Sequence, residues 1–181
     1  MGRERNVSER PQFEVTAIGS FKQKPGCPDY VHTAMSAEEI SRLCLNECYN
    51  PSNERNKIDR IEIVKITPTT ELDSISNNIQ DPWKVFTCND KGEGCSANFF
   101  DDEYVLNNKS SLYYARAIQE PTNMVGGDPL RCELNEAGEC IKIKPCYSSG
   151  PDFDPNDDCL APVGERAWSS PIFLTHPMSM Y

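Results

Sequence analysis

Nine cysteines are the residues of this 181-residue chain whose type and spacing point most directly to chemistry. A zinc site normally uses paired Cys-x-x-Cys spacings, and the chain contains none. A cysteine nucleophile needs a base beside it, and neither histidine of the chain lies in a recognisable catalytic motif. We therefore interpret the cysteines mainly as halves of disulfides. They are Cys27, Cys44, Cys48, Cys88, Cys95, Cys132, Cys140, Cys146 and Cys159.

Six of these cysteines form three short-range pairs that each flank a turn or a loop. Each bond would close a short loop and contribute roughly 2–4 kcal/mol in the chain-entropy model. The glycine-rich turn inside the first pair predicts a hairpin, whose opposed strands bring Cα atoms within bridging distance. The predicted pairs are Cys88–Cys95, Cys132–Cys140 and Cys146–Cys159.

Three cysteines remain near the N-terminus. Cys44 and Cys48 stand four residues apart on one face of a predicted helix, which suits two ligands of one metal or two separate disulfides. We favour a bond from Cys27 to either Cys44 or Cys48. The odd cysteine is then free, or it pairs outside this segment.

An acidic stretch at 152–158 resembles the opening of a calcium loop. Its oxygen ligands would come from Asp152, Asp154, Asp157 and Asp158, but the expected glycine and the closing glutamate are missing. We favour a solvated acidic loop over a weak Ca²⁺ site. No other cofactor is expected in this chain. The acidic run at 101–103 is likewise predicted to be a solvated turn, and His176 an exposed loop histidine.

Arg166 and Trp168 enter the last predicted strand together. An arginine beside a tryptophan is able to form a stacked anchor or to border a binding cleft. The alternative is that Trp168 packs into the core while Arg166 pairs with an acidic neighbour. The residue pattern favours neither of these interpretations.

The elements that must position these residues are mostly strands. Alternating or dense apolar residues predict strands over 13–17, 58–66, 84–88, 95–100, 112–119 and 168–174, with 84–88 and 95–100 as hairpin partners. The capping box at Ser36–Glu39 predicts one short helix over about 37–47, ended by a turn at 50–53. The expected fold is a mainly β, β-sandwich-like domain over 11–181, with a flexible segment at 1–10 and a Cys-rich insert at 123–160.

Charge and composition exclude several classes of function. The formal net charge is −10, and the whole acidic excess lies beyond residue 67, so the basic footprint of a nucleic-acid binder is missing. No apolar run is long enough to span a membrane. Residues 1–10 lack the apolar region of a signal peptide, although disulfides indicate export. We therefore expect the chain to be the C-terminal part of a longer precursor.

Several stretches together resemble one family. They are Phe13-Glu14-Val15 to Gly19-Ser20-Phe21, Lys24-Pro25-Gly26-Cys27-Pro28-Asp29-Tyr30, Glu47-Cys48-Tyr49-Asn50-Pro51, Ile58-Asp59-Arg60-Ile61-Glu62-Ile63-Val64-Lys65, Asp81-Pro82-Trp83, Tyr113-Tyr114-Ala115-Arg116-Ala117 and Glu165-Arg166-Ala167-Trp168-Ser169-Ser170-Pro171-Ile172. From Pro11 onward they resemble the C-terminal region of the bacterial domain-of-unknown-function family three-six-zero-four. Its full-length members look like exported metal-dependent hydrolases of the polymerase-and-histidinol-phosphatase type.

The resemblance implies a non-catalytic β module that packs on, or borders, an upstream catalytic domain in the periplasm or outside the cell. The metal ligands of such hydrolases lie around a Gly-Asp-Leu-His-x-His-type motif, which this chain lacks. The resemblance therefore assigns no catalytic residue and no metal ligand here. An independent module that binds Ca²⁺ or a protein is the second hypothesis. A stand-alone hydrolase is the third.

Overall fold

The computed structural model describes residues 2–69, 78–89, 94–125, 131–145, 157 and 159–179. Strands dominate these residues, which confirms the predicted mainly β, sandwich-like fold with a disulfide-rich insert. No helix in these ranges is long and apolar enough to cross a bilayer. The helices are α1 (Asp29–Ala34), α2 (Ala37–Cys44) and α3 (Glu103–Asn107). The strands are β1 (Arg3–Asn6), β2 (Gln12–Ala17), β3 (Phe21–Gln23), β4 (Pro51–Arg55), β5 (Ile58–Ile66), β6 (Ile79–Thr87), β7 (Cys95–Phe100), β8 (Ser111–Gln119), β9 (Thr122–Val125), β10 (Cys132–Leu134), β11 (Cys140–Ile143), β12 (Leu160–Val163), β13 (Arg166–Trp168) and β14 (Ile172–Thr175).

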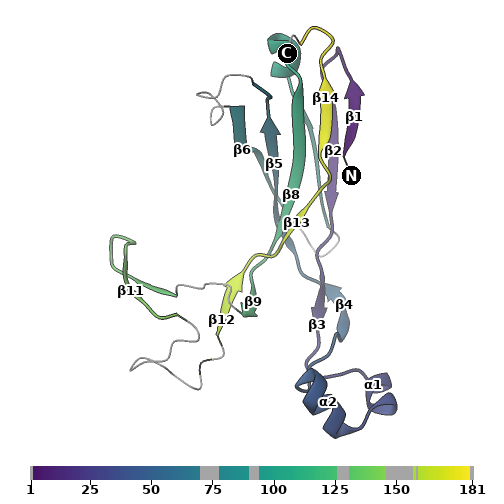
Figure 1. The fold of residues 1–181 in the computed structure, drawn as a ribbon, viewed down its shortest axis with the longest axis vertical. Coiled ribbons are helices and arrows are strands. Elements are labelled where there is room, and N and C mark those ends of the chain that lie inside the picture. The colour runs from purple at the N-terminus through teal and green to yellow at the C-terminus, as the bar shows by residue number, and fades with distance from the viewer. Residues whose placement is uncertain are drawn as a thin grey trace.

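Two sheets of unequal size form the sandwich. The large sheet has the order β1-β14-β8-β5-β6, and β13 also pairs with β8. In the described part of the chain, the small sheet consists of β2 and β7, paired antiparallel. In Figure 1 these strands make up the upper part of the molecule. The small sheet therefore covers only part of one face of the large one.

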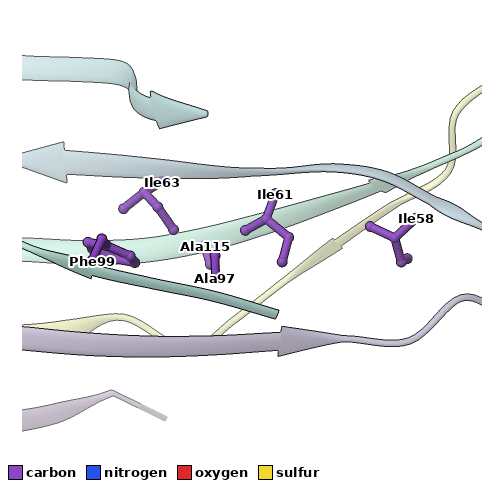
Figure 2. Packing of buried hydrophobic residues seen from close by; sticks show 6 residues of the cluster. All are labelled: Ile58, Ile61, Ile63, Ala97, Phe99 and Ala115. Atoms are coloured by element: carbon purple, nitrogen blue, oxygen red, sulfur yellow. The ribbon is translucent and has the colours of Figure 1, made fainter. Parts of the chain in front are cut away.

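The core lies between β5 and β8 of the large sheet and β2 and β7 of the small one. Figure 2 shows Ile61 and Ile63 projecting from β5 toward the side on which Ala97 and Phe99 lie, with Ile58 at the far end of the cluster. Phe99 stacks on Phe13 of β2, with ring centroids 5.0 Å apart. Ile61 and Ile63 alternate with Glu62 along β5, so the two isoleucines face the small sheet while Glu62 lies on the opposite face.

Two arms extend from the lower end of the sandwich in Figure 1. The helical arm comprises residues 21–55, in which β3 pairs with β4 and carries α1 and α2. The insert arm comprises the described residues between 122 and 163, in which β9 pairs with β12 and β10 with β11. Only Ile40 is buried in the helical arm, and no described residue of the insert arm is.

The predicted helix is confirmed, although it is shorter than expected. The Ser36 hydroxyl accepts a hydrogen bond from the Glu39 amide at 3.3 Å, and a Glu39 carboxylate oxygen accepts one from the Ser36 amide at 2.9 Å. The helix ends at Cys44 because Leu45 adopts a left-handed conformation. One helix was too few, since α1 and α3 are also helical.

Three further expectations need correction. Residues 95–100 do not pair with 84–88: β6 pairs with β5, whereas β7 pairs with β2 in the other sheet. The expected turn at 50–53 runs into β4 instead. The last predicted strand is divided into β13 and β14 by the segment 169–171, which ends in a proline.

The N-terminal segment is also not wholly flexible. Arg3–Asn6 form β1, which runs parallel to β14 at one edge of the large sheet. All four residues of β1 are exposed. Main-chain pairing rather than burial therefore holds the strand, and such a strand leaves no apolar pattern in the sequence.

Candidate functional site

A groove of about 530 Å³ opens on the side of the sandwich where the small sheet stops. One wall consists of residues 15–20 at the end of β2, and the other of residues 165–169 around β13. Ala115, Ala117 and Gln119 of β8 also line it. We call this cavity the β2–β13 groove.

A hydrogen-bond network forms the polar end of the groove. The Gln119 side-chain oxygen accepts from the Ser20 amide at 3.3 Å and from the Ser20 hydroxyl at 3.0 Å. The Gln119 side-chain nitrogen donates to the Glu165 carboxylate at 2.9 Å. Asn56 donates to the Ser20 hydroxyl at 3.0 Å. Because Gln119 is buried, these bonds fix its amide and bring together chain segments that are far apart in sequence.

Gly19 makes this network possible. A Cβ atom at position 19 would lie 1.8 Å from the carbonyl oxygen of Asn56, so no other residue fits there without moving the backbone. The close approach places Ser20 beside Asn56, whose amide donates to the Ser20 carbonyl at 2.8 Å. The Gly19 carbonyl accepts from an Arg55 guanidinium nitrogen at 2.7 Å. The Arg55 guanidinium also stacks over the Phe21 ring at 3.8 Å.

Arg166 and Trp168 both line the groove. Register places them opposite Ile118 and Arg116, so their side chains lie on the face of the large sheet away from Ala117 and Ala167. Trp168 is 59% exposed, so the interpretation that it packs into the core is wrong. Arg166 forms no ion pair with any residue that the structure describes.

The disulfides follow the local spacing. Cys88–Cys95 and Cys132–Cys140 are bonded as predicted, and Cys27 is bonded to Cys48. Cys44 is the free cysteine of the described residues. Cys159 is also disulfide-bonded, whereas its predicted partner Cys146 lies outside the described residues. Disulfides of this number are typical of an oxidising compartment.

Cys88–Cys95 has a different role from the predicted one. It does not close a hairpin, because β6 belongs to the large sheet and β7 to the small sheet. The bond instead links the two layers at the point where the chain crosses between them. Both cysteines pack against the apolar core.

Of the calcium candidates, only Asp157 is described; Asp152, Asp154 and Asp158 lie outside the described residues. One oxygen of Asp157 accepts from the Cys159 amide at 2.9 Å, and the other forms an ion pair with Arg131. These bonds hold the pKa of Asp157 below its usual range, the Cys159 amide having the larger effect. Within the described ranges no three groups suited to metal ligation come together.

Asp101 and His176 are buried, so the prediction of an exposed loop histidine is wrong, and that of a solvated acidic run is wrong for Asp101 although Asp102 and Glu103 are exposed. Asp101 forms an ion pair with Lys65 at 2.6 Å and accepts from the Tyr113 hydroxyl at 2.6 Å. Burial, together with the hydrogen bond to Asp101 and its negative charge, raises the pKa of Tyr113 far above its ordinary value. His176 packs edge-on against Tyr104, with ring centroids 5.4 Å apart. This cluster is part of the interior rather than of a site.

A second ionic network lies on the opposite face of the large sheet. Glu62 bridges Arg60 at 2.7 Å and Arg116 at 2.5 Å, and Arg116 continues to Asp81. Burial acts to raise the pKa of Glu62, but hydrogen bonds from the two arginines and their charges outweigh it. The pKa therefore lies below its usual value, and Glu62 remains ionised at neutral pH.

The lining of the β2–β13 groove combines apolar and polar residues. Among the described residues that line it there is no histidine or cysteine, and the one carboxylate there, Glu165, is hydrogen-bonded to Gln119. Backbone edges, apolar side chains and arginines line the rest. Comparison of the chain with models of protein families, with curated proteins and with solved structures gave no match.

Sequence reasoning found only part of this site. Arg166 and Trp168 were singled out, but Gly19, Ser20 and Gln119 were not assigned a role. Gly19-Ser20 was visible only as a part of the stretches that carry the family resemblance. Gln119 closes the predicted strand at 112–119 and has no local feature that marks it as a hydrogen-bonding centre.

Proposed function

We propose that this chain is a non-catalytic β module of an exported, metal-dependent hydrolase, and that it packs on the hydrolase's upstream catalytic domain. The family resemblance supports the identity of that neighbour, and the disulfides support a periplasmic or extracellular location. One structural observation carries the docking itself: the helical arm exposes large apolar side chains that a free-standing module would bury.

The exposed apolar residues of the helical arm are large and close together in sequence. Tyr30, Leu43, Leu45 and Tyr49 are 70%, 58%, 81% and 69% exposed, respectively. Leu43 and Leu45 flank the free Cys44 at the end of α2. Single exposed apolar residues are ordinary, but such a group on one small arm is typical of an interaction surface. We therefore place the contact with the catalytic domain on this arm.

The experiment compares the longer precursor with two variants. In the precursor, Leu45→Asp combined with Tyr49→Asp would lower metal-dependent phosphoester turnover and thermal stability, because both side chains would be buried at the contact. Leu106→Asp is the matched control, since Leu106 is 78% exposed on α3 and away from the arm. Equal loss in the double variant and the control, or no loss in either, would refute the proposal.

Hydrogen exchange gives a second, independent measure. Amides around Leu43–Tyr49 would exchange more slowly in the precursor than in the isolated chain, because the contact excludes water from the end of α2. Amides of β5, buried in both proteins, serve as the internal reference. Unchanged exchange over the helical arm would mean that the docking surface lies elsewhere.

A further inference from the structure

The two layers of the sandwich differ greatly in width. The large sheet has six strands and the small sheet two. Because β13 and β14 lie in one row beside β8, the large sheet is five strands wide. At a strand spacing of about 4.8 Å, the small sheet is therefore roughly 14 Å narrower than the sheet that it covers. The uncovered inner face belongs to β13, β14 and β1, and the β2–β13 groove lies over part of it.

β2 presents an unpaired edge to this uncovered region. Its ladder with β7 includes a hydrogen bond from the Asp101 amide to the Pro11 carbonyl. Antiparallel pairing alternates, so residues 13, 15 and 17 bond to β7. The main-chain groups of Gln12, Glu14 and Thr16 therefore point to the other side. Within the described part of the chain, no strand pairs with that edge.

A second cavity continues along the same edge. It has a volume of about 410 Å³ and is lined by Gln12 and Phe13 of β2, by Ile172 and Leu174 of β14, and by Arg3 and Arg5 of β1. The β2–β13 groove begins at Val15, two residues further along β2. The two cavities thus follow one another beside the free edge, over the inner face of the large sheet, and we refer to them together as the channel.

The charge of this channel is opposite to that of the molecule. The chain carries a net charge of −10, yet Arg3, Arg5 and Arg55 line the two cavities, and Glu165 is the one carboxylate among the described lining residues. Arg166 contributes main chain only, because its side chain lies on the other face of the sheet. Arg3 and Arg5 form no ion pair with any described residue. An arginine-lined channel on an acidic protein attracts an acidic ligand.

We propose that the free edge of β2 binds an extended, acidic segment of a partner polypeptide, which adds a third strand to the small sheet. Main-chain hydrogen bonds to Gln12, Glu14 and Thr16 would supply affinity, as in other cases of strand addition. Apolar side chains of the segment would cover Ile172 and Leu174, and acidic ones would meet Arg3 and Arg5. The proposed docking residues, Tyr30 and Leu43–Tyr49, do not line the channel, so failure of the proposed docking would leave this site unaffected.

The test uses a synthetic peptide of alternating Glu and Val, acetyl-EVEVEVE-amide. A slip of one residue presents either set of side chains to the channel, so one peptide tests both registers. NMR titration of the ¹⁵N-labelled chain would show saturable shifts along β2 and β14. The amides of Glu14 and Thr16 would exchange roughly tenfold more slowly at saturation, as expected for newly bonded groups.

Two control peptides separate strand addition from attraction by charge alone. The same peptide N-methylated at every residue loses its main-chain donors in either register, and KVKVKVK reverses the charge. Each control peptide would bind at least about tenfold more weakly than EVEVEVE. Loss of one or two hydrogen bonds, or loss of charge complementarity, produces a change of that size. Equal binding of the N-methylated peptide, or no saturable binding of EVEVEVE, would overturn the proposal.

Protein variants test the edge itself. Thr16→Pro removes one free-edge amide where proline is tolerated, and Thr16→Val keeps it. Proline would abolish binding and valine would not. Arg3→Glu with Arg5→Glu would weaken binding, while Arg3→Lys with Arg5→Lys would retain most of it, which gives a test independent of the folding of Thr16→Pro. Two outcomes would refute the proposed occupant of β2. One is slower amide exchange at Arg166 and Trp168 instead of at Glu14 and Thr16 when the peptide binds. The other is a dimer of the chain that the Thr16→Pro substitution dissociates.

Discussion

The sandwich and the two arms are built from the same chain but are stabilised in different ways. The sandwich buries Ile61, Ile63, Phe99 and the Lys65–Asp101 ion pair, so its layers are held by packing and by paired charges. The helical arm buries only Ile40, and no described residue of the insert arm is buried. Instead, each arm carries at least one disulfide. Where a segment is too thin to bury a core, covalent links replace packing.

The largest effect should follow loss of a core side chain. Phe99→Ala removes a ring that packs on Phe13, Trp83 and Phe86, and should lower the free energy of unfolding by about 3–5 kcal/mol. Denaturant titration measures this. Leu45→Ala, at an 81% exposed position of the helical arm, should change stability by less than about 0.5 kcal/mol. Similar losses in both variants would show that the arm is packed as the core is.

Removal of an arm disulfide should act locally. Cys27→Ser with Cys48→Ser opens a loop of 21 residues and should cost the helical arm about 3 kcal/mol in the chain-entropy model. Hydrogen exchange would then rise over α1 and α2, while β5 and β8 keep their protection. Cys88→Ser with Cys95→Ser is the comparison, because that bond links the two sheets. It should lower the unfolding midpoint of the whole sandwich.

Lowering the pH should reduce the stabilisation from the Glu62 ionic network of the sandwich more than that from exposed ion pairs of the arms. The pKa of Glu62 is lowered in the folded chain from its ordinary 4.5, so its stabilisation is complete above about pH 4.5 and is lost as the pH falls through the folded value. At pH 7, Glu62→Gln should cost about 1.5–3 kcal/mol, the range for hydrogen bonds to a charged group. The difference in the free energy of unfolding between the Glu62→Gln variant and the parent chain should become smaller as the pH falls toward 3.

Glu133→Gln provides the control for that pH series. Glu133 forms an ion pair with Lys144 on the insert arm, and both side chains are about half exposed. Such pairs contribute less than about 1 kcal/mol, so its effect should be small at every pH. A Glu62→Gln penalty that stays constant from pH 7 to pH 3 would mean that the carboxylate is not the stabilising group.

The smallest effect is expected at Cys44. Cys44→Ser should change the stability of the isolated chain by less than about 0.5 kcal/mol, because the thiol forms no disulfide and the site is partly exposed. A thiol titration of the unreduced, denatured chain should find one reactive group, and none in the variant. Three reactive thiols would mean that one of the disulfides is not formed.

Sequence reasoning predicted the elements better than their partners. β2, β5 and β8 carry clear apolar patterns, and α2 carries a capping box, so local rules were sufficient to locate them. The partner of β7 was predicted wrongly because the turn between Cys88 and Cys95 has the composition of a hairpin, while the choice of sheet depends on distant packing. β1 carries no apolar pattern at all.

The site was harder to predict than the fold. Its walls, residues 15–20 and 165–169, are about 150 positions apart and meet only through the network centred on Gln119. Trp168 and Arg166 were noticed because their types are distinctive, although register places their side chains on the opposite face of the sheet. His176 was misplaced because burial of a loop residue depends on Tyr104, which lies on α3.

The parallel ladder between β1 and β14 has a mechanical consequence. Arg3 pairs with Ile172 and Asn6 with Thr175, so both strands run in the same direction at the edge of the large sheet. Tension applied at Arg3 and at Thr175 would pull the two strands past each other along their length. All hydrogen bonds of the ladder would then bear the force at once, in a shearing geometry, whereas an antiparallel pair pulled from one end opens one bond at a time. The β1–β14 edge, whose strand β1 has no apolar pattern, is therefore the part of the sandwich that resists a force applied to the first and last strands.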